Sequence, residues 1–246
     1  MLEQPTGADA RTGTQRAWRT VLARIERDLI EGALGPGDRL PAERELAADL
    51  GVGRSSVREA LRVLEVMGLI RTSTGSGPQA GAIVIAAPSG GMSALLRLQV
   101  AAQGFPLSDV VQTRLVLEDA VAARLSEDPD RDLGGVRSIL RAMDDDGLTA
   151  PEFLALDAEL HYALAAASGN TVITAMMAGL RTAIESYVLD GSARIEDWDA
   201  MASRLRAEHH EIVDAIEAGG SVAARALVRT HITGYYTAAG LVSGEH

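Results

Sequence analysis

The chain has 246 residues, of which 47% are hydrophobic and 23% charged, a composition typical of folded proteins and a length that suits two domains. It has no cysteine, which excludes disulfides, thiolate metal sites and cysteine nucleophiles, and its net charge at pH 7 is −11. No apolar run of signal-peptide or membrane-span length occurs, so we expect a cytoplasmic protein without a membrane partner.

The negative charge belongs to the second part of the chain. Residues 1–77 contain 11 arginines and 11 acidic residues, whereas residues 78–246 contain 12 arginines and 23 acidic residues. The first part is therefore neutral overall, and the second part has the whole acidic surplus. Such an acidic body disfavours nonspecific adhesion to nucleic acid.

The first predicted element is an amphipathic helix at residues 16–31, after a tail at residues 1–15 that we expect to be disordered. Its apolar positions recur at the helical period; they are Val21, Leu22, Ile25, Leu29 and Ile30. Glycines and prolines between residues 32 and 41 then form a dense turn signal that ends this helix.

Two short helices joined by a tight turn follow. The first begins near Ala42 and ends at Gly51, and the second runs from Arg54 to about Met67. Its inward face is predicted to contain Val57, Ala60, Leu61, Leu64 and Met67. Two helices with a glycine-containing turn form the helix-turn-helix pattern. Short β-branched runs at residues 69–72 and 82–85 predict a hairpin, so residues 16–85 are interpreted as a winged helix-turn-helix domain.

The second of these helices has arginines at Arg54, Arg58 and Arg62, one per turn, on its outward face. Arginine reads guanine edges and clamps phosphates, so this face could enter a DNA groove. The alternative is a solvated helix face on which the arginines pair with Glu59 and Glu65. The surrounding helix, turn and hairpin pattern favours DNA binding.

The rest of the chain has a helical pattern throughout. Residues 86–92 mix proline, serine and glycine and are the predicted linker. Residues 93–246 are predicted to form an all-α antiparallel bundle. Its amphipathic stretches lie near residues 92–103, 107–126, 132–145, 150–168, 171–190, 195–218 and 221–240.

Three of the five histidines lie on predicted inward faces of this bundle. Asp157 and His161 are four residues apart, which aims a carboxylate and an imidazole at one point, a suitable spacing for a divalent metal. His209 and His231 belong to two later helices and are flanked by apolar residues. Alternatively, each histidine is a core residue that makes an ordinary hydrogen bond, and the spacing alone does not show that the four side chains converge.

The segment LPAERELAADLGVGRSSVREALRVLEVMGLI, preceded by GALGPGDR, resembles the DNA-binding domain of the GntR family of bacterial transcription regulators. The resemblance implies DNA contacts from Arg44 on the first short helix and from the second short helix. On that helix the implied contacts are Arg54, Ser55, Ser56 and Arg58. It also places Gly75 of the wing at the minor groove, although this wing has no basic side chain.

Residues 107–240 resemble the all-helical FCD-type ligand-binding domain of the FadR-type branch of this family, with RLVLE, DAELH, SGN and EHHEIVDAI as matching segments. The resemblance implies that Asp157, His161, His209 and His231 hold a divalent metal and that an effector completes its coordination. Zinc is the expected ion, with nickel, manganese or iron as alternatives. His209 matches the family position better than His210.

Two further residues are implied to bind the effector. Arg114 matches a residue that anchors an effector carboxylate, and its alternative role is an intrahelical pair with Glu118. Asn170 matches a residue that faces the effector, and its alternative role is an ordinary helix cap.

Together these features predict a ligand-responsive transcription regulator, by family expectation a repressor. It would bind palindromic operator DNA as a homodimer and respond to a small organic acid. One alternative is a metal sensor without an organic effector. Another is a metal-dependent hydrolase, which lacks an assignable general base and leaves the DNA-binding segment unexplained.

Overall fold

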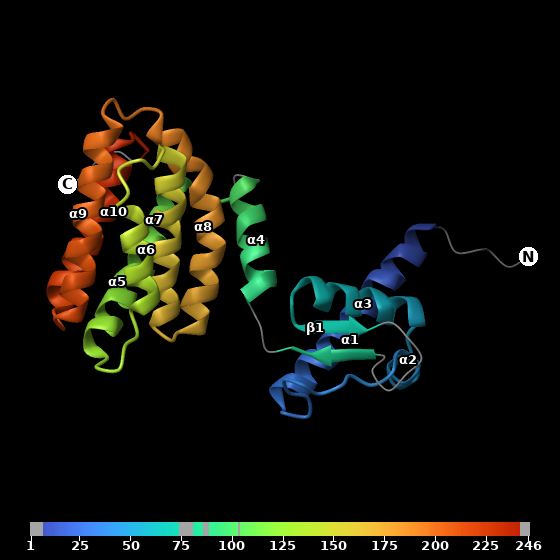
Figure 1. Ribbon diagram of the computed structural model, residues 1–246. Coiled ribbons are helices and arrows are strands. Elements are labelled where there is room, and N and C mark those ends of the chain that lie inside the picture. Colours follow the sequence, from blue (N-terminus) through green and yellow to red (C-terminus); the bar gives the residue numbers. More distant parts are fainter. Residues whose placement is uncertain (1–6, 74–80, 86–88, 103, 242–246) are drawn as a thin grey trace, which may run out of the picture. The chain divides into compact units, whose positions relative to one another are not determined.

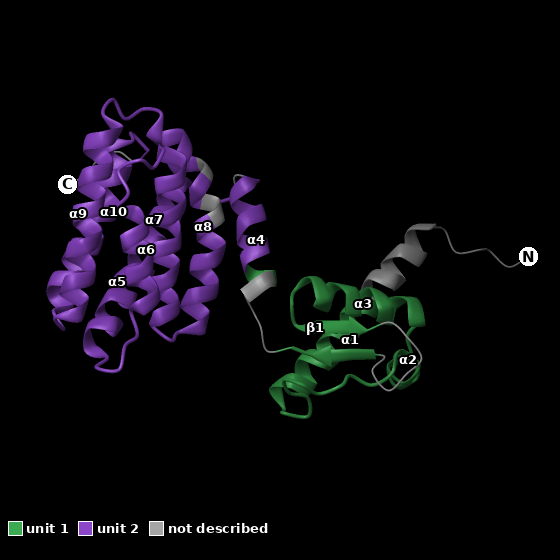
Figure 2. Ribbon diagram, in the orientation of Figure 1, with its two compact units in different colours: residues 1–92 green, residues 93–246 purple. Residues whose placement is uncertain are grey.

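The computed structural model describes residues 7–73, 81–85, 89–102 and 104–241 (Figure 1). The chain divides into two compact units, residues 1–92 and residues 93–246 (Figure 2). Within the described ranges, no helix is both long enough and apolar enough to cross a membrane.

The first unit is a winged helix-turn-helix. It consists of α1 (Gly7–Ile30), α2 (Glu43–Leu50), α3 (Arg54–Val66) and a hairpin of β1 (Ile70–Ser73) and β2 (Gly81–Val84). The strands are antiparallel, with Ile70 opposite Val84 and Ser73 opposite Gly81. Both predicted strands are thus confirmed within one residue. The loop at residues 74–80, which contains Gly75, lies outside the described residues.

The turn between α2 and α3 depends on Gly51. Its backbone has φ +63°, a left-handed conformation that glycine adopts without steric cost. Its N–H group caps the last carbonyls of α2, and Gly53 then precedes the first turn of α3. This short connection lets α2 and α3 share one core with α1; its largest buried side chains include Val21, Ile25, Leu46, Val57, Leu61 and Leu64.

The structure corrects several expectations in this unit. α1 begins at Gly7, whereas a disordered tail was expected up to residue 15; Ala8 and Ala10 have high helix propensity and no proline interrupts the segment. Ile30 and Met67 were expected to face inward but are 78% and 50% exposed. Both lie at helix ends, where the chain turns away from the core.

The second unit is an all-α bundle. Its helices are α4 (Ser89–Ala101), which belongs to this unit from residue 93 on, α5 (Leu107–Glu127), α6 (Gly134–Met143), α7 (Ala150–Ala167), α8 (Thr171–Ser192), α9 (Trp198–Glu217) and α10 (Ser221–Ala238). Helix α5 packs against α10, α7 packs against α8, and α9 packs against α10. The predicted linker at residues 86–92 was too long, because α4 already begins at Ser89; residues 86–88 lie outside the described residues.

Local sequence signals set the helix boundaries near the site. Helix α7 starts with a capping box, in which the backbone N–H of Thr149 donates to Glu152 Oε2 at 2.9 Å. Helix α9 is preceded by the N-cap Asp197, whose carboxylate accepts from the N–H of Ala200 at 2.9 Å. These caps fix where α7 and α9 begin and so which of their side chains face the interior.

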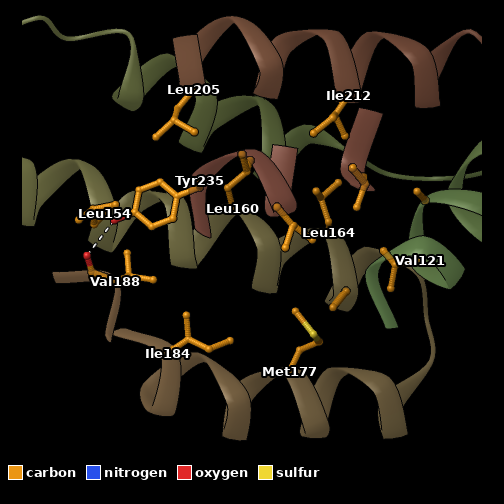
Figure 3. Close-up of a cluster of buried hydrophobic side chains, with 14 of the residues drawn as sticks. Val121, Leu154, Leu160, Leu164, Met177, Ile184, Val188, Leu205, Ile212 and Tyr235 are labelled. Atoms are coloured by element: carbon orange, nitrogen blue, oxygen red, sulfur yellow. Dashed lines mark hydrogen bonds between the residues drawn. The ribbon is translucent and has the colours of Figure 1, made fainter. Parts of the chain in front are cut away.

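The interior of the bundle is a continuous apolar core (Figure 3). Its side chains come from all of the long helices, among them Phe153, Leu160, Leu205, Ile212 and Tyr236. A polar cluster lies within this core, and burial of such a cluster requires that its charges be compensated.

Candidate metal centre, effector cavity and DNA-binding surface

Four polar side chains from three helices converge inside the bundle. Asp157 and His161 come from α7, His209 from α9 and His231 from α10. One ligand atom from each residue lies within 4.8 Å of all the others. The three imidazoles are at most 4% exposed, and the Asp157 side chain is 13% exposed. The structure therefore brings together all four residues that the sequence proposed.

The spacing of the donor atoms fits a single cation. His209 Nε2 lies 3.0 Å from Asp157 Oδ1 and 3.1 Å from His231 Nε2. His161 Nε2 lies 3.2 Å from His231 Nε2 and 3.8 Å from Asp157 Oδ1. With zinc bond lengths of about 2.0–2.1 Å, neighbouring ligand atoms lie roughly 2.9 Å apart in octahedral and roughly 3.4 Å apart in tetrahedral coordination. The distances of 3.0, 3.1 and 3.2 Å lie in this interval, whereas the distances from Asp157 Oδ1 to His161 Nε2 and His231 Nε2, 3.8 and 3.9 Å, exceed it by about 0.4–0.5 Å.

Two carboxylates orient the imidazoles from behind. Glu118 Oε2 lies 2.5 Å from His161 Nδ1, and Glu208 Oε2 lies 2.8 Å from His231 Nδ1. Each carboxylate favours the tautomer with the proton on Nδ1, which leaves the Nε2 lone pair facing the cluster. Two such lone pairs would then face each other at 3.2 Å, an arrangement that a shared cation relieves.

The third imidazole is held differently. His209 Nδ1 is buried and has no hydrogen-bond partner among the described residues. The ring instead stacks on Phe153, with centroids 6.5 Å apart. Its Nε2 atom is directed to Asp157, so the orientation of His209 depends on packing and on the cluster itself.

Burial and mutual charge set the protonation of this site. Burial lowers the pKa of His209 to about 4, and the neighbouring His231 acts in the same direction. Burial alone would raise the pKa of Asp157, but the surrounding imidazoles, His161 first, hold it well below its usual range. At neutral pH the cluster thus has an anionic carboxylate and a neutral His209, as metal binding requires.

Arg114 adjoins the cluster on α5 and is 6% exposed. Its Nε atom donates to Glu118 Oε1 at 2.5 Å, so the intrahelical pair considered from the sequence is present. Burial would lower the pKa of Arg114, but Glu118, Tyr236 and Asp157 together outweigh it and keep the guanidinium ionised. Burial likewise opposes ionisation of Glu118, yet Arg114 and His161 lower its pKa to about 2.

A cavity of about 210 Å³ opens between α7 and α8 and reaches the cluster. Arg114, Asp157 and His161 line it on the cluster side. Its other walls are mainly apolar and include Leu154, Ala155, Ala158, Met177, Ile184, Val188 and Leu189. Arg114 thus both pairs with Glu118 and faces a space large enough for a small ligand.

Asn170 does not line this cavity. Its side-chain oxygen accepts from the N–H groups of Val172 and Ile173 at 3.1 and 3.2 Å, which makes it the N-cap of α8. The capping alternative is therefore present in the structure, and an effector contact of Asn170 stays a prediction. In the SGN segment, Ser168 is the C-cap of α7, Gly169 has φ +71° and Asn170 is the N-cap of α8.

The arginines of the first unit lie on an exposed face. Arg44 on α2 and Arg54, Ser55 and Arg58 on α3 are all exposed. Arg58 approaches Glu43 only loosely, with Nε and Oε2 4.0 Å apart. Glu65, considered as a partner of the arginines, instead accepts from the backbone N–H of Thr72 at 2.8 Å. The exposed side chains are available to a duplex.

Ser56 is the exception on this helix, because it is only 4% exposed. One residue corresponds to about 100° of helix rotation, which places Ser56 beside Val57 and Ala60 on the inward face. A DNA contact from its hydroxyl, expected from the resemblance, is not compatible with this burial.

Sequence reasoning missed the orienting roles of Glu118 and Glu208. Glu118 was considered only as a partner of Arg114, although it also contacts His161 across 43 positions of sequence. Glu208 precedes His209 directly, yet its carboxylate contacts His231 on α10. The four-residue spacing between Arg114 and Glu118 predicts their contact from the sequence. The contact of Glu118 with His161 depends on how the helices pack.

Comparisons with known proteins agree with the fold. The family described as "FCD domain" matches residues 109–234, and "Bacterial regulatory proteins, gntR family" matches residues 18–78. The chain is 29% identical over 211 residues to the HTH-type transcriptional regulator LutR of Bacillus subtilis, covering 82% of this chain and 91% of LutR.

Two further similarities extend over most of the chain. The HTH-type transcriptional repressor NanR of Citrobacter rodentium is 29% identical over 220 residues, covering 85% of this chain and 79% of NanR. The solved structure of Streptococcus agalactiae GntR superposes with a TM-score of 0.61 at 27% identity, covering 88% of this chain and 97% of that one.

A winged helix-turn-helix followed by a helical bundle with a polar cluster at its centre defines a DNA-binding transcription regulator rather than an enzyme. The chain belongs to the GntR family, in its FadR-type branch with an FCD domain. Membership implies operator DNA as the partner of the first unit and a small-molecule effector for the second.

Proposed function

We propose that this protein is a repressor whose C-terminal bundle holds a divalent metal and binds a small carboxylic acid that modulates operator binding. The observation that carries the proposal is the convergence of Asp157, His161, His209 and His231, of which Asp157 and His161 also line the α7–α8 cavity. A metal sensor would need the cluster but not the cavity. The cavity therefore favours an organic effector.

The donor set supports zinc as the bound ion, with nickel, manganese or iron as alternatives. Asp157 would supply the anionic ligand, and the three histidines would supply neutral nitrogen ligands. The bound ion would provide a Lewis-acidic anchor for a carboxylate. The carboxylates of Glu118 and Glu208 keep two of the imidazoles in the tautomer that this role requires.

Arg114 supports a carboxylate ligand rather than a cationic or neutral one. Its guanidinium lines the cavity, is held in place by Glu118, and has a second contact to the hydroxyl of Tyr236 at 3.4 Å. A prepositioned guanidinium loses little conformational freedom when it binds a carboxylate. Effector binding would thus depend on both the cluster and Arg114.

Regulation requires that the acid bind one arrangement of the protein more tightly than the other. A complete switch from 1:99 to 99:1 needs about 5.5 kcal/mol of differential binding, whereas about 1–3 kcal/mol adjusts operator occupancy by degrees. We propose a two-fold homodimer that reads a palindrome, since paired helix-turn-helix heads bind two half-sites.

The test is a DNA-binding titration of the full-length protein. A duplex selected from a random library by the protein itself serves as the probe, and its affinity is measured by fluorescence anisotropy at fixed salt. Metal-free protein is compared with protein loaded with zinc alone and with zinc plus each member of a panel of organic acids. A change that needs an acid supports the proposal, whereas release by zinc alone, with no response to any acid, identifies a metal sensor.

A further inference from the structure

We infer that the effector is a monocarboxylic acid with a short apolar chain, rather than a dicarboxylic acid or a hydroxylated sugar acid. This inference rests on the proposed function, because it assumes that a carboxylate binds next to the metal cluster. It specifies the rest of the molecule, and it is drawn from the walls, the charge balance and the opening of the α7–α8 cavity.

The walls beyond the cluster are mainly apolar on both sides. Helix α7 contributes Leu154 and Ala158, and helix α8 contributes Met177, Ile184 and Val188. Figure 3 shows Met177 and Ile184 of α8 pointing toward the side chains of α7. None of these side chains can accept or donate a hydrogen bond. A ligand with several hydroxyl groups would lose its bonds to water along this wall without replacement.

The charged groups along the cavity already have partners. Arg181 donates from Nε to Glu185 Oε1 at 3.0 Å and also contacts the carboxylate of Glu159. Arg114 is paired with Glu118 in the same way. Tyr162 adds one hydroxyl to the described lining. The cavity thus offers a strong cationic end at the cluster and few polar groups elsewhere.

The charge balance at the inner end admits one carboxylate. Arg114 neutralises Glu118, and Arg204 lies 3.1 Å from Glu208. The charge of Asp157 then leaves one positive charge on a divalent cation held by the cluster, and a single carboxylate neutralises it. A second carboxylate would lie near Arg181, which already pairs with both Glu159 and Glu185. These three side chains together have a net charge of −1, so they would repel a second carboxylate.

The size and the opening of the cavity suit a small apolar molecule. Its volume of about 210 Å³ is below the roughly 300–1,000 Å³ of sites for drug-sized ligands. Leu189, which is 41% exposed, and the exposed Pro151 belong to its lining. An apolar chain would therefore lie mainly against apolar side chains.

The first test uses the unaltered, zinc-loaded, full-length protein and isothermal titration calorimetry. Acetate, butanoate and hexanoate form a series in chain length, and adipate and gluconate match hexanoate in carbon number. We expect affinity to rise about fourfold per buried methylene, on the order of 100-fold from acetate to hexanoate. Adipate and gluconate should bind at least about tenfold more weakly than hexanoate.

The second test narrows the cavity. Ala158→Leu places a larger side chain in its wall, whereas Ala166→Leu, the matched control, adds the same side chain at an exposed position of α7 that does not line it. Hexanoate affinity should fall on the order of tenfold in Ala158→Leu, with acetate affinity and zinc content unchanged. Ala166→Leu should bind both acids like the unaltered protein. Equal hexanoate affinity in the two variants would overturn the inference.

The outcomes separate this inference from the function on which it rests. If acetate and hexanoate bind equally, or if adipate or gluconate binds more tightly than hexanoate, the apolar-chain inference is wrong and the carboxylate effector remains supported. If no carboxylate binds the zinc-loaded protein at all, both proposals are overturned. The unaltered protein alone decides this comparison, so the result does not depend on how a variant folds.

Discussion

The carboxylate of Glu208 lies 2.8 Å from Nδ1 of His231, and these two residues belong to different helices, α9 and α10. Burial opposes ionisation of Glu208, but its contact with His231 lowers its pKa, so the acceptor is charged at neutral pH. The contact therefore fixes both the ring orientation and the tautomer of a proposed metal ligand from a second helix.

We expect Glu208→Ala to weaken zinc binding by about 10- to 100-fold, the usual cost of losing a group that orients a metal ligand. Competition with a chromophoric chelator measures the affinity. Glu211→Ala, an exposed change on the same helix, is the matched control and should leave it unaltered. Equal affinities in the two variants would show that the Glu208 contact does not contribute.

The paired histidines in the EHH segment give a direct test of the proposed ligand set. His209 faces the cluster, whereas His210 is exposed and contacts Asp144 at 2.9 Å. The double change His209→Ala and His231→Ala should abolish metal retention, measured by elemental analysis after dialysis, and should leave operator affinity of the metal-free protein largely unchanged. His210→Ala should retain the metal in full. Loss of metal from His210→Ala alone would contradict the assignment.

The metal-free protein should lose stability as the pH falls. The folded pKa of His209 is about 4 and its ordinary value is 6.5, so between these values the unfolded chain binds a proton that the folded chain does not. The free energy of unfolding therefore declines as the pH falls through this window. The shift in the pKa of His209 corresponds to a loss on the order of 3 kcal/mol. Thermal unfolding of chelator-treated protein between pH 7 and about 4 measures it. His209→Gln should flatten this dependence, and an unchanged slope would refute the explanation.

Much of this arrangement follows from local patterns in the sequence. Apolar periodicity located the long helices of the bundle, because each must bury one face, and the boundaries of α5, α7 and α10 agree with the expected ranges within two residues. The four-residue spacing of Asp157 and His161 fixes their common helix face. The same periodicity placed His209 and His231 inward, since their apolar neighbours determine the buried side.

Other features depend on packing between distant segments. The contact of Glu118 with His161 and that of Glu208 with His231 each join two helices, and no local rule predicts them. The burial of Ser56 follows from its position next to Val57, but the family resemblance suggested exposure. The SGN segment suited both a helix cap and an effector contact for Asn170; the structure shows the cap, and the effector contact stays a prediction.

The exposed arginines of the first unit should determine sequence-specific DNA binding. The Arg58 side chain is 60% exposed, and its ion pair with Glu43 is long at 4.0 Å. Binding of Arg58 to a base edge would therefore cost little in lost contacts within the protein. Arg58→Ala should weaken binding to the selected duplex by about 1–3 kcal/mol and relax specificity at one position. Arg27→Ala, an exposed change on α1, is the control for lost charge. Equal losses with selected and random duplexes would indicate a phosphate contact instead.

Ser55 and Ser56 are adjacent, but Ser55 is exposed and Ser56 is buried, so we expect them to have different roles. The Ser55 hydroxyl is exposed in the first turn of α3, where it can donate to a phosphate, so Ser55→Ala should cost about 0.5–1.5 kcal/mol with every duplex. Ser56 faces the core and is 4% exposed, so Ser56→Ala should alter thermal stability rather than DNA affinity. Anisotropy titrations and melting curves on both variants distinguish the two effects. A loss of affinity in Ser56→Ala as large as that in Ser55→Ala, at unchanged melting temperature, would mean that α3 presents a different face to DNA.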